Sequence, residues 1–417
     1  MAGSAAPGDS HAAAAAAGEN AAPHGGNRLA LARRLGCRPE QLLEASASLV
    51  PFAPPAVLRR ALRRSLGDGQ RLPLLGGLLA ALGSGGGGDS LALRDYPDRS
   101  YGALREAIAA LHGLDPAAVL PGNGAAELFT WAAREAAAAG VSLLPTPGFA
   151  DYRRALACWG ACWRPLPLPL HWSASFPQPF PLPPGDGPDG GAACLWITNP
   201  HNPSGQLWSR ASLEPLLGRF ALVVVDEAFL PLVPGGEAQT LIPLLAAHPN
   251  LVVVRSLTKL CAIAGLRLGY ALAAPSRLAR WAAWRDPWPV NGLAAAAGTA
   301  LLSDGPALAR WLARVHGWMA AEGPALARGL AGVQGLQPLP SAANYLLVRA
   351  SAGAAATSLQ PLRLALQNRH RILLRDCRSF EGLGDGWLRI ALLDRRGNRR
   401  LLRALRQEAP GCLGPAR

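Results

Sequence analysis

Short apolar runs recur along the middle of the chain, each bounded by polar, Gly or Pro residues. They are VSLLP, CLWIT, ALVVVDEAF, LVVVRS and GYALAA, at residues 141–145, 194–198, 221–229, 251–256 and 269–274. Continuous apolar runs of this length predict strands buried on both faces, and the helical patterns between them predict crossover connections. The chain is therefore expected to form an α/β domain with a mainly parallel sheet, whose ligand site lies at the carboxyl ends of the strands.

The pattern changes near residue 291. A long Ala/Leu/Arg-rich stretch predicts helical structure to about residue 331. Strands are then expected at 344–350, 371–375 and 387–393, and a closing helix near 398–407. This part of the chain predicts a second, smaller α+β domain.

Breaks in composition suggest where the domains begin and end. The Ala-rich start of the chain, the Gly-rich GSGGGGDS at 83–90 and the Pro-rich run at 165–191 each predict a tail, loop or insertion. The resulting division is a disordered tail at 1–23, an N-terminal segment at 24–90 that joins the small domain, a large domain at 91–290 and a C-terminal small domain at 291–417.

Composition and charge narrow the classes of function. The 417 residues can bury a large core, and the net charge of +14 comes from scattered Arg rather than from a basic run interleaved with aromatics. We therefore expect no nucleic-acid partner and a preference for anionic small molecules. The seven cysteines form neither a CxxC pair nor a cluster at zinc spacing, which predicts reduced thiols and no metal site. No run is long enough to span a membrane and the tail lacks a secretory signal, so a soluble, cytoplasmic protein is expected.

Lys259 is the only lysine among the 41 basic residues. It is either a surviving surface residue or a candidate for covalent chemistry, because a desolvated lysine can lose its proton and act as a nucleophile, whereas Arg cannot. Asp226 ends one apolar run, and Lys259 follows the next. A carboxylate and an amine at neighbouring strand ends suit pyridoxal phosphate (PLP), whose aldehyde bonds to a lysine and whose ring nitrogen stays protonated beside an Asp.

The phosphate of such a cofactor needs a cradle of donors. PGNGAAE at 121–127 is a Gly-bearing turn that leads into a helix, so that backbone N–H groups can face an anion. Ser256, Thr258 and Arg267 lie close to Lys259 in the chain and offer hydroxyls and a fixed cation. Asn202, in the turn NPHNPSG, can donate to the phenolic oxygen of the cofactor.

The motifs GNGAAE, NPHNPSG, VDEAF, SLTK and GLRLGY occur in an order that resembles the fold type I, class I/II aminotransferase-like enzymes that use PLP. Within this family HGGN, RDYPD, TPGFADY, DEAF, ANYLLVR and RILLRDC are most similar to the threonine-phosphate decarboxylases of cobalamin biosynthesis, relatives of the histidinol-phosphate aminotransferases. The resemblance runs from residue 24 to the last helix. It implies a large PLP-binding domain and a homodimer.

The resemblance also implies roles for single residues. Lys259 would hold the cofactor covalently, Asp226 would partner the pyridinium nitrogen, Asn202 would contact the ring oxygen and Phe149 would stack on the ring. The residues expected to hold the cofactor phosphate are Gly124, Ala125, Ser256, Thr258 and Arg267, with Tyr96 reaching it from the neighbouring subunit.

The remaining implied roles concern the substrate. Arg389 would bind the substrate carboxylate and Arg375 a second anionic group, with Asn202 nearby. His24 and Asn27 would help to bind the substrate phosphate. The segment EASASLVPFA at 44–53 departs from the subgroup, since Ser48 and Val50 stand where Asn is expected.

The implied reaction is decarboxylation of L-threonine O-3-phosphate to (R)-1-amino-2-propanol O-2-phosphate. One alternative is an aminotransferase acting on a phosphorylated amino substrate, like the histidinol-phosphate enzyme. A second is a non-catalytic regulator, which would need a DNA-binding module that the short, Ala-rich tail does not offer.

Overall fold

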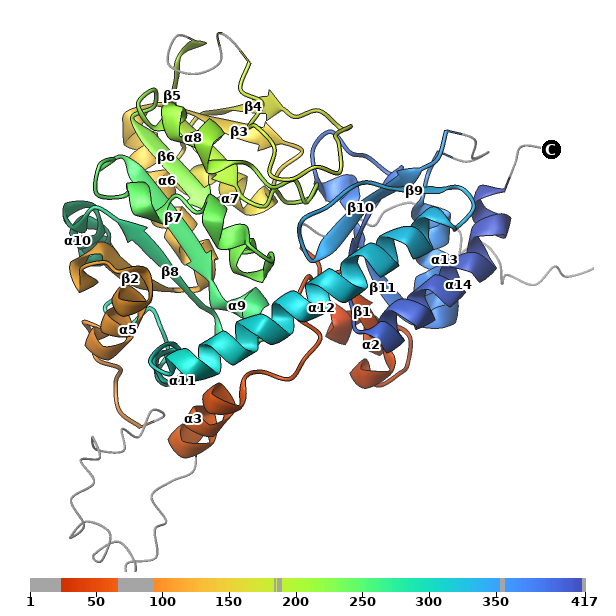
Figure 1. Ribbon diagram of the computed structural model, residues 1–417, viewed down its shortest axis with the longest axis horizontal. Coiled ribbons are helices and arrows are strands. Elements are labelled where there is room, and N and C mark those ends of the chain that lie inside the picture. The colour runs from red at the N-terminus through yellow and green to blue at the C-terminus, as the bar shows by residue number, and fades with distance from the viewer. Residues whose placement is uncertain (1–23, 67–93, 184, 186–189, 353–356, 415–417) are drawn as a thin grey trace, which may run out of the picture.

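A computed structural model of the chain describes residues 24–66, 94–183, 185, 190–352 and 357–414. The predicted tail at 1–23 and the Gly-rich segment at 83–90 lie outside these residues. The described chain forms two β-sheets, joined by a long helix that passes beside both (Figure 1).

The larger sheet has seven strands in the order β2-β8-β7-β6-β5-β3-β4. Its strands are β2 (Val119–Asn123), β3 (Val141–Thr146), β4 (Trp163–Pro167), β5 (Ala192–Thr198), β6 (Leu222–Asp226), β7 (Leu251–Ser256) and β8 (Leu268–Ala273). The neighbours from β4 to β7 pair in parallel, while β8 is antiparallel to both β7 and β2. The predicted α/β fold with a mainly parallel sheet is confirmed.

Both faces of this sheet are buried, because successive side chains of a strand point to opposite sides. Val224 packs in a cluster with α6 (Gly124–Ala139), α7 (Ala150–Ala157) and α10 (Pro275–Trp284). Val223 and Val225 belong to the main core on the other face, with α5 (Gly102–His112), α8 (Arg210–Leu217) and α11 (Gly292–Leu302). The uninterrupted valines of β6 follow from this double burial.

One strand of the large sheet differs from the sequence-based expectations. β4 occupies the start of the Pro-rich run that was expected to be a loop, because a proline can lie in an edge strand, where a missing N–H breaks no ladder. The stretch from residue 291 is helical as predicted and forms two helices, α11 and α12 (Gly305–Ala331). Asp304 separates them and caps the second, its side chain accepting a hydrogen bond from the Ala307 N–H.

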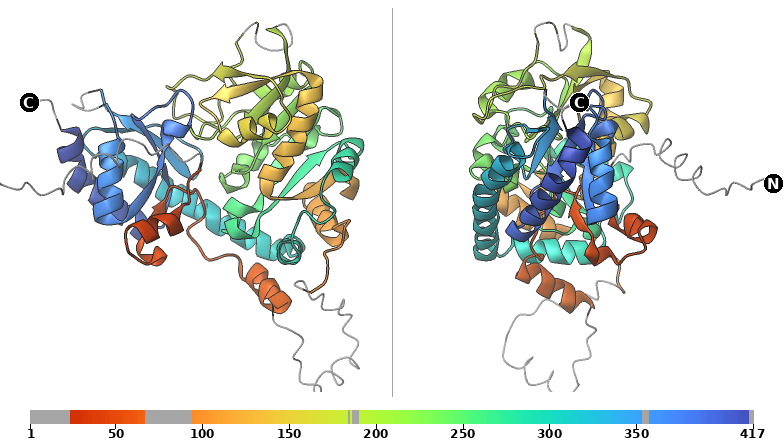
Figure 2. Two further views of the ribbon diagram at one scale, coloured as in Figure 1. Left: turned by 180° about the vertical axis from the view of Figure 1, so that it is seen from behind. Right: turned by 90° about the vertical axis from the view of Figure 1, so that its right-hand side faces the viewer.

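The smaller sheet has five strands in the order β1-β11-β12-β10-β9. They are β1 (Leu43–Ala45), β9 (Leu336–Pro338), β10 (Tyr345–Ala350), β11 (Ile372–Asp376) and β12 (Trp387–Ala391). β1 comes from the N-terminal part of the chain and pairs in parallel with β11. Helices α13 (Gln360–His370) and α14 (Arg395–Leu413) pack beside this sheet, and α2 (Arg28–Arg34) contacts β11 through Leu373 (Figure 2).

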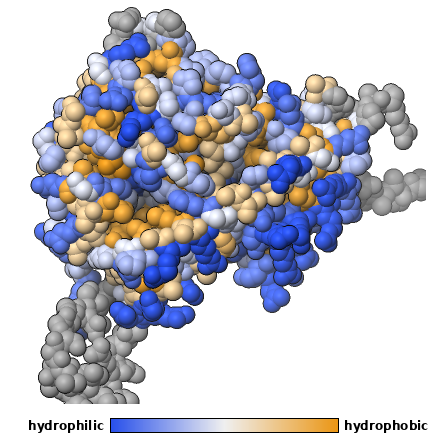
Figure 3. All heavy atoms as spheres, viewed as in Figure 1, coloured by the Kyte–Doolittle hydropathy of each residue, from blue (hydrophilic) through white to orange (hydrophobic). Residues whose placement is uncertain are grey.

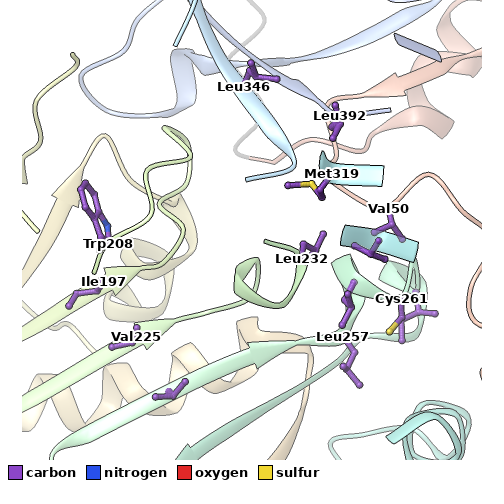
Figure 4. Packing of buried hydrophobic residues seen from close by; sticks show 14 of the residues in the cluster. Val50, Ile197, Trp208, Val225, Leu232, Leu257, Cys261, Met319, Leu346 and Leu392 are labelled. Atoms are coloured by element: carbon purple, nitrogen blue, oxygen red, sulfur yellow. The ribbon is translucent and has the colours of Figure 1, made fainter. Parts of the chain in front are cut away.

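Helix α12 (Gly305–Ala331) ties the two sheets together. Trp311 donates to the Leu260 carbonyl at 2.9 Å and Trp318 to the Leu393 carbonyl at 2.9 Å, so the helix is bonded to both sheet regions. Figure 4 shows Met319 of α12 among buried side chains that include Leu232 and Leu392. Near its start α12 follows α11, against which α3 (Ala56–Leu66) packs.

The surface is not uniform in polarity. Hydrophilic side chains gather over the region of α14 and α2 (Figure 3). The exposed arginines of α14 are Arg395, Arg396, Arg399, Arg400, Arg403 and Arg406. Among the helices of the described residues, none has the length and apolar character that a membrane span requires.

Candidate active site

Polar side chains from several strands meet at one edge of the large sheet. Asp226 ends β6, Lys259 lies in the short helix α9 (Leu257–Leu260) directly after β7, and Asn202 follows β5. Arg267 reaches the same edge from the other direction, because β8 is antiparallel and begins there. The predicted residues that follow different strands are therefore brought together by the topology, as expected for an open α/β sheet.

These residues line a cavity of about 320 Å³, within the size range of small-molecule sites, which we call the main pocket. The small sheet closes it with Arg375 of β11 and Arg389 of β12. The predicted residues that line it are His24, Ala125, Phe149, Asn202, Asp226, Ser256, Thr258, Lys259, Arg267, Arg375 and Arg389.

Lys259 lies in an environment that favours its neutral form. Burial of the ammonium group, together with the charges of Arg389 and Arg267, lowers the pKa of Lys259 to about 8, while Asp226 opposes them. About a tenth of the amine is thus unprotonated at pH 7, against less than a thousandth for an ordinary lysine. The amine can act as a nucleophile without the strongly alkaline medium that an ordinary lysine needs.

Asp226 is a deeply buried carboxylate, with 5% of its surface exposed. Its Oδ1 accepts the Ala228 N–H at 2.9 Å and its Oδ2 accepts the Tyr152 hydroxyl at 2.7 Å. Burial raises the pKa of Asp226 to about 6, and these two hydrogen bonds limit the rise. A buried carboxylate is stabilised by a cationic partner, and the protonated ring nitrogen of PLP is such a partner.

Beside Lys259 the chain forms a cradle for an anion. Gly124 begins α6 with a φ of +72°, which favours glycine, and a Cβ at this position would displace the guanidinium of Arg267 from where it lies. The hydroxyls of Ser256 and Thr258 lie 2.7 Å apart at the same edge. A helix N-terminus, two hydroxyls and an arginine together suit a phosphate. The residues present therefore fit PLP.

Arg375 and Arg389 are direct cross-strand partners on β11 and β12. Arg389 donates to Oδ1 of Asn202 and, at 3.1 Å, to the Ser46 carbonyl, while its Nε has no hydrogen-bond partner within the described residues. Arg375 donates to Ser379 at 2.6 Å. Burial and the nearby Arg389 lower the pKa of Arg375 to about 10. Like charges held opposite each other destabilise a sheet unless an anion lies between them.

Three predicted residues lie at the margin of this arrangement. His24 lines the main pocket with its ring 5.7 Å from that of Phe149, and burial lowers the pKa of His24. Asn27 instead lines an adjoining cavity of about 390 Å³, which we call the outer pocket and which is also lined by Arg34, Arg363, Gln367 and Arg378. Tyr96 is 78% exposed and stacks on Trp288 with ring centroids 4.4 Å apart, outside the main pocket. The ligand contacts expected of these residues stay predictions.

Other residues of the site were not predicted from sequence. Tyr152 donates a hydrogen bond to Asp226, and its hydroxyl also lies 2.7 Å from the Thr198 hydroxyl. The only feature of the sequence that could have indicated this role is the position of Tyr152 in the TPGFADY motif. Asp151 lines the main pocket and pairs with Arg154 at 2.5 Å. Ser48, from the segment that departs from the subgroup pattern, lines the main pocket with a buried hydroxyl that lacks a hydrogen-bond partner within the described residues.

Comparison with known proteins gives a consistent set of relatives. The family model for aminotransferase class I and II matches residues 88–405. The threonine-phosphate decarboxylase of Salmonella typhimurium is 33% identical over 412 residues, covering 94% of this chain and 98% of that protein. The histidinol-phosphate aminotransferase of Symbiobacterium thermophilum is 34% identical over 317 residues, covering 75% and 81%. The fold is shared with the histidinol-phosphate aminotransferase of Sinorhizobium meliloti, solved in complex with pyridoxal-5′-phosphate (TM-score 0.73, 21% identity, covering 93% and 95%).

Proposed function

The chain belongs to the aminotransferase class I and II family of PLP-dependent enzymes, and from this premise we propose that it decarboxylates L-threonine O-3-phosphate. The product would be (R)-1-amino-2-propanol O-2-phosphate, for use in cobalamin biosynthesis. The observation that carries the proposal is the pair formed by Arg375 and Arg389. These two positively charged side chains lie opposite each other on neighbouring strands and both line the pocket of Lys259. A substrate with two anionic ends, a carboxylate and a phosphate, matches this pair.

In the proposed reaction Arg389 holds the substrate carboxylate. Its guanidinium is fixed by Asn202 and the Ser46 carbonyl, and its free Nε is available for the ligand. Arg375, which donates a hydrogen bond to Ser379, would bind the substrate phosphate. Two fixed ends set the rotation of the substrate about its α-carbon, so this pair of contacts chooses which bond at that carbon is broken.

PLP, when bound, supplies an electron sink for the pair of electrons that the departing carboxylate leaves behind. Asp226 keeps the ring nitrogen cationic from its buried position. Lys259 would move the proton: its lowered pKa lets the amine release and accept a proton close to neutral pH, and in the proposed reaction this amine protonates the α-carbon after carbon dioxide departs.

Carbon dioxide release from L-threonine O-3-phosphate by the purified, PLP-loaded enzyme tests the proposal. We expect release without any 2-oxo acid, together with one equivalent of the phosphorylated amino alcohol. The Arg375→Gln variant should show a kcat/KM lower by about tenfold or more on the phosphorylated substrate. The change on L-threonine should be much smaller, because L-threonine has no phosphate for Arg375 to contact. Strict dependence on 2-oxoglutarate, with glutamate formed, would contradict the proposal.

A second candidate is an aminotransferase for a phosphorylated amino substrate. It is favoured by the identity of 34% to a histidinol-phosphate aminotransferase. Histidinol phosphate has one anionic end, however, so only one of the two arginines would bind an anionic group of this substrate. Formation of the corresponding ketone from histidinol phosphate, with 2-oxoglutarate converted to glutamate, at a higher kcat/KM than carbon dioxide release from L-threonine O-3-phosphate would favour this candidate.

We also propose a homodimer in which Tyr96 reaches the main pocket of the partner. The support is that Tyr96 is a large aromatic residue with 78% of its surface exposed. It stacks on Trp288 of the same chain and does not line the main pocket of that chain. Mixing Tyr96→Phe and Lys259→Ala subunits provides the test. A shared site predicts recovery of activity on mixing, since one pocket of each hybrid combines an intact Lys259 with an intact Tyr96, whereas a monomer predicts no recovery.

A further inference from the structure

The outward side of α14 carries a row of arginines. They recur at every third or fourth residue, and residues at this spacing are neighbours on one face of a helix. A sixth arginine of the helix, Arg400, donates to the Gln41 and His370 carbonyls. The other five are exposed, and their side chains have no hydrogen bond or ion pair within the described residues. We call this set the arginine face: Arg395, Arg396, Arg399, Arg403 and Arg406.

The carboxylates at this helix are engaged elsewhere. Asp394 caps the start of α14, where its side chain accepts a backbone N–H at 2.7 Å. Glu408, on the same helix, lies 2.9 Å from Arg369 and 2.8 Å from His370, which belong to α13. The arginine face therefore keeps a net positive charge.

The placement of these arginines opposes the stability of the helix. Arg395 and Arg396 lie in the first turn, where the helix dipole is positive and disfavours cations, and the last turn has no basic residue. Arg399 lies four residues from both Arg395 and Arg403, and like charges at this spacing also destabilise a helix. An anionic partner would relieve both kinds of repulsion, so the arrangement favours binding of a polyanion.

The shape and composition of α14 favour a flat anionic surface. The helix rises about 17 Å from Arg395 to Arg406, and hydrophilic residues gather over it (Figure 3). Leu401 and Leu405 are buried and α14 packs against α13 and α12, so the helix is not free to enter the major groove of DNA. It has no aromatic residue on which bases could stack and no exposed large apolar residue for the centre of a protein interface.

We propose that the arginine face attaches the protein to a membrane surface that contains anionic lipids. Each basic residue close to such a surface is attracted by its negative potential, so several together can hold a folded protein without an inserted segment. Arginine stays charged at all physiological pH values, so the attachment is insensitive to pH in that range. No residue of α14 lines the main pocket, and the attachment does not depend on which reaction that pocket catalyses.

Co-sedimentation of the PLP-loaded, full-length protein with lipid vesicles tests the proposal. We expect binding to phosphatidylcholine vesicles that contain phosphatidylglycerol, and binding about tenfold weaker or less to phosphatidylcholine alone. Raising the salt from about 0.1 M to about 1 M shortens the Debye length from about 10 Å to about 3 Å and should weaken binding about tenfold or more. No binding to the anionic vesicles, or equal binding to both kinds, would overturn the proposal.

Substitutions in the arginine face locate the binding on α14. The triple variant Arg396→Gln, Arg399→Gln and Arg403→Gln removes three charges and should weaken binding to the anionic vesicles about tenfold or more. The replaced side chains are exposed and repel one another, so the fold should be kept, and absorbance of the bound cofactor checks it. If the triple variant loses the cofactor, Arg399→Glu alone changes the charge by two and should weaken binding about tenfold.

The matched control lies on α3. The triple variant Arg59→Gln, Arg60→Gln and Arg63→Gln removes the same charge from exposed arginines of a helix that packs against α11, and binding should stay within about twofold. Equal losses in the two triple variants would show that net charge rather than the arginine face decides the binding, and would overturn the proposal. Tighter binding of a duplex DNA oligonucleotide than of the anionic vesicles, at equal phosphate concentration, would overturn it in favour of nucleic acid.

Discussion

The hydroxyl of Tyr152 donates a 2.7 Å hydrogen bond to Oδ2 of Asp226. The same hydroxyl lies 2.7 Å from Oγ1 of Thr198 at the end of β5, so the phenol links two strand ends through one helix side chain. This bond stabilises the charged form of a carboxylate that burial would otherwise neutralise. Asp226 can therefore remain an anion although only 5% of its surface is exposed.

Replacing Tyr152 by Phe removes this bond and keeps the ring. We expect the pKa of Asp226 to rise above its value of about 6, because one of the contacts that lower it is lost. The acid limb of the kcat/KM profile should then move to higher pH, with a loss of about tenfold or more near neutral pH. Tyr270→Phe is the control, since the Tyr270 hydroxyl bonds to His112 at 2.9 Å and does not line the main pocket. An unchanged acid limb in Tyr152→Phe would contradict the role given to this bond.

The pKa of Lys259 makes the uptake of PLP by the apoprotein dependent on pH. Its value of about 8 predicts that the rate rises with pH and levels off above about pH 8, because the neutral amine is the reactive form. In Arg389→Gln the inflection should move to higher pH, since a cation that lowers the pKa is removed. Absorbance of the bound cofactor measures the rate. An inflection near the ordinary lysine value of 10.5 in the unchanged protein would show that burial does not act as described.

Gly124 offers a test of the phosphate cradle with a close control. In Gly124→Ala the new Cβ would lie 2.4 Å from Nη2 of Arg267, so the guanidinium has to move and the Kd of PLP should rise about tenfold. Gly113→Ala creates the same left-handed strain, at a φ of +65°, with no atom within 4 Å of the Cβ. Both variants should lose about 1–2 kcal/mol of stability, but only the first should bind PLP more weakly. Equal PLP affinities, measured by titration of the apoproteins, would argue against the cradle.

A buried ion pair supports the same edge of the sheet. The side chains of Arg255 and Glu227 are 2% and 0% exposed and lie 2.7 Å apart. Arg255 directly precedes Ser256 in the chain, and Glu227 directly follows Asp226. Arg255→Gln should lower the free energy of unfolding by about 3–5 kcal/mol, because it leaves Glu227 buried without its partner. The exposed pair of Arg153 and Glu381 is the control, and Arg153→Gln should cost about 1 kcal/mol or less in urea unfolding. Equal losses in the two variants would contradict the importance of burial.

The hydrophobic pattern of the sequence was sufficient to predict the strands that are buried on both faces of the large sheet. The valines of β6 and β7 and the apolar run of β5 predicted buried strands, and their ends located Asp226 and Lys259. β2 and β4 were missed because their sequences, VLPGN and WRPLP, contain prolines that usually disfavour strands. The direction of β8 was also not predictable, since apolar periodicity is the same whichever way a strand runs.

By itself, the sequence determined the chemical groups of this protein: a single lysine, an aspartate after a buried strand, a glycine turn and the arginines, in an order shared with a known family. Only the tertiary structure decided how they meet. Pairing of β11 with β12 sets Arg375 opposite Arg389, pairing of β1 with β11 brings Ser46 to Arg389, and packing of α7 brings Tyr152 to Asp226. These contacts join residues far apart in the chain, and their energies depend on burial and distance, which a linear pattern of residues does not contain.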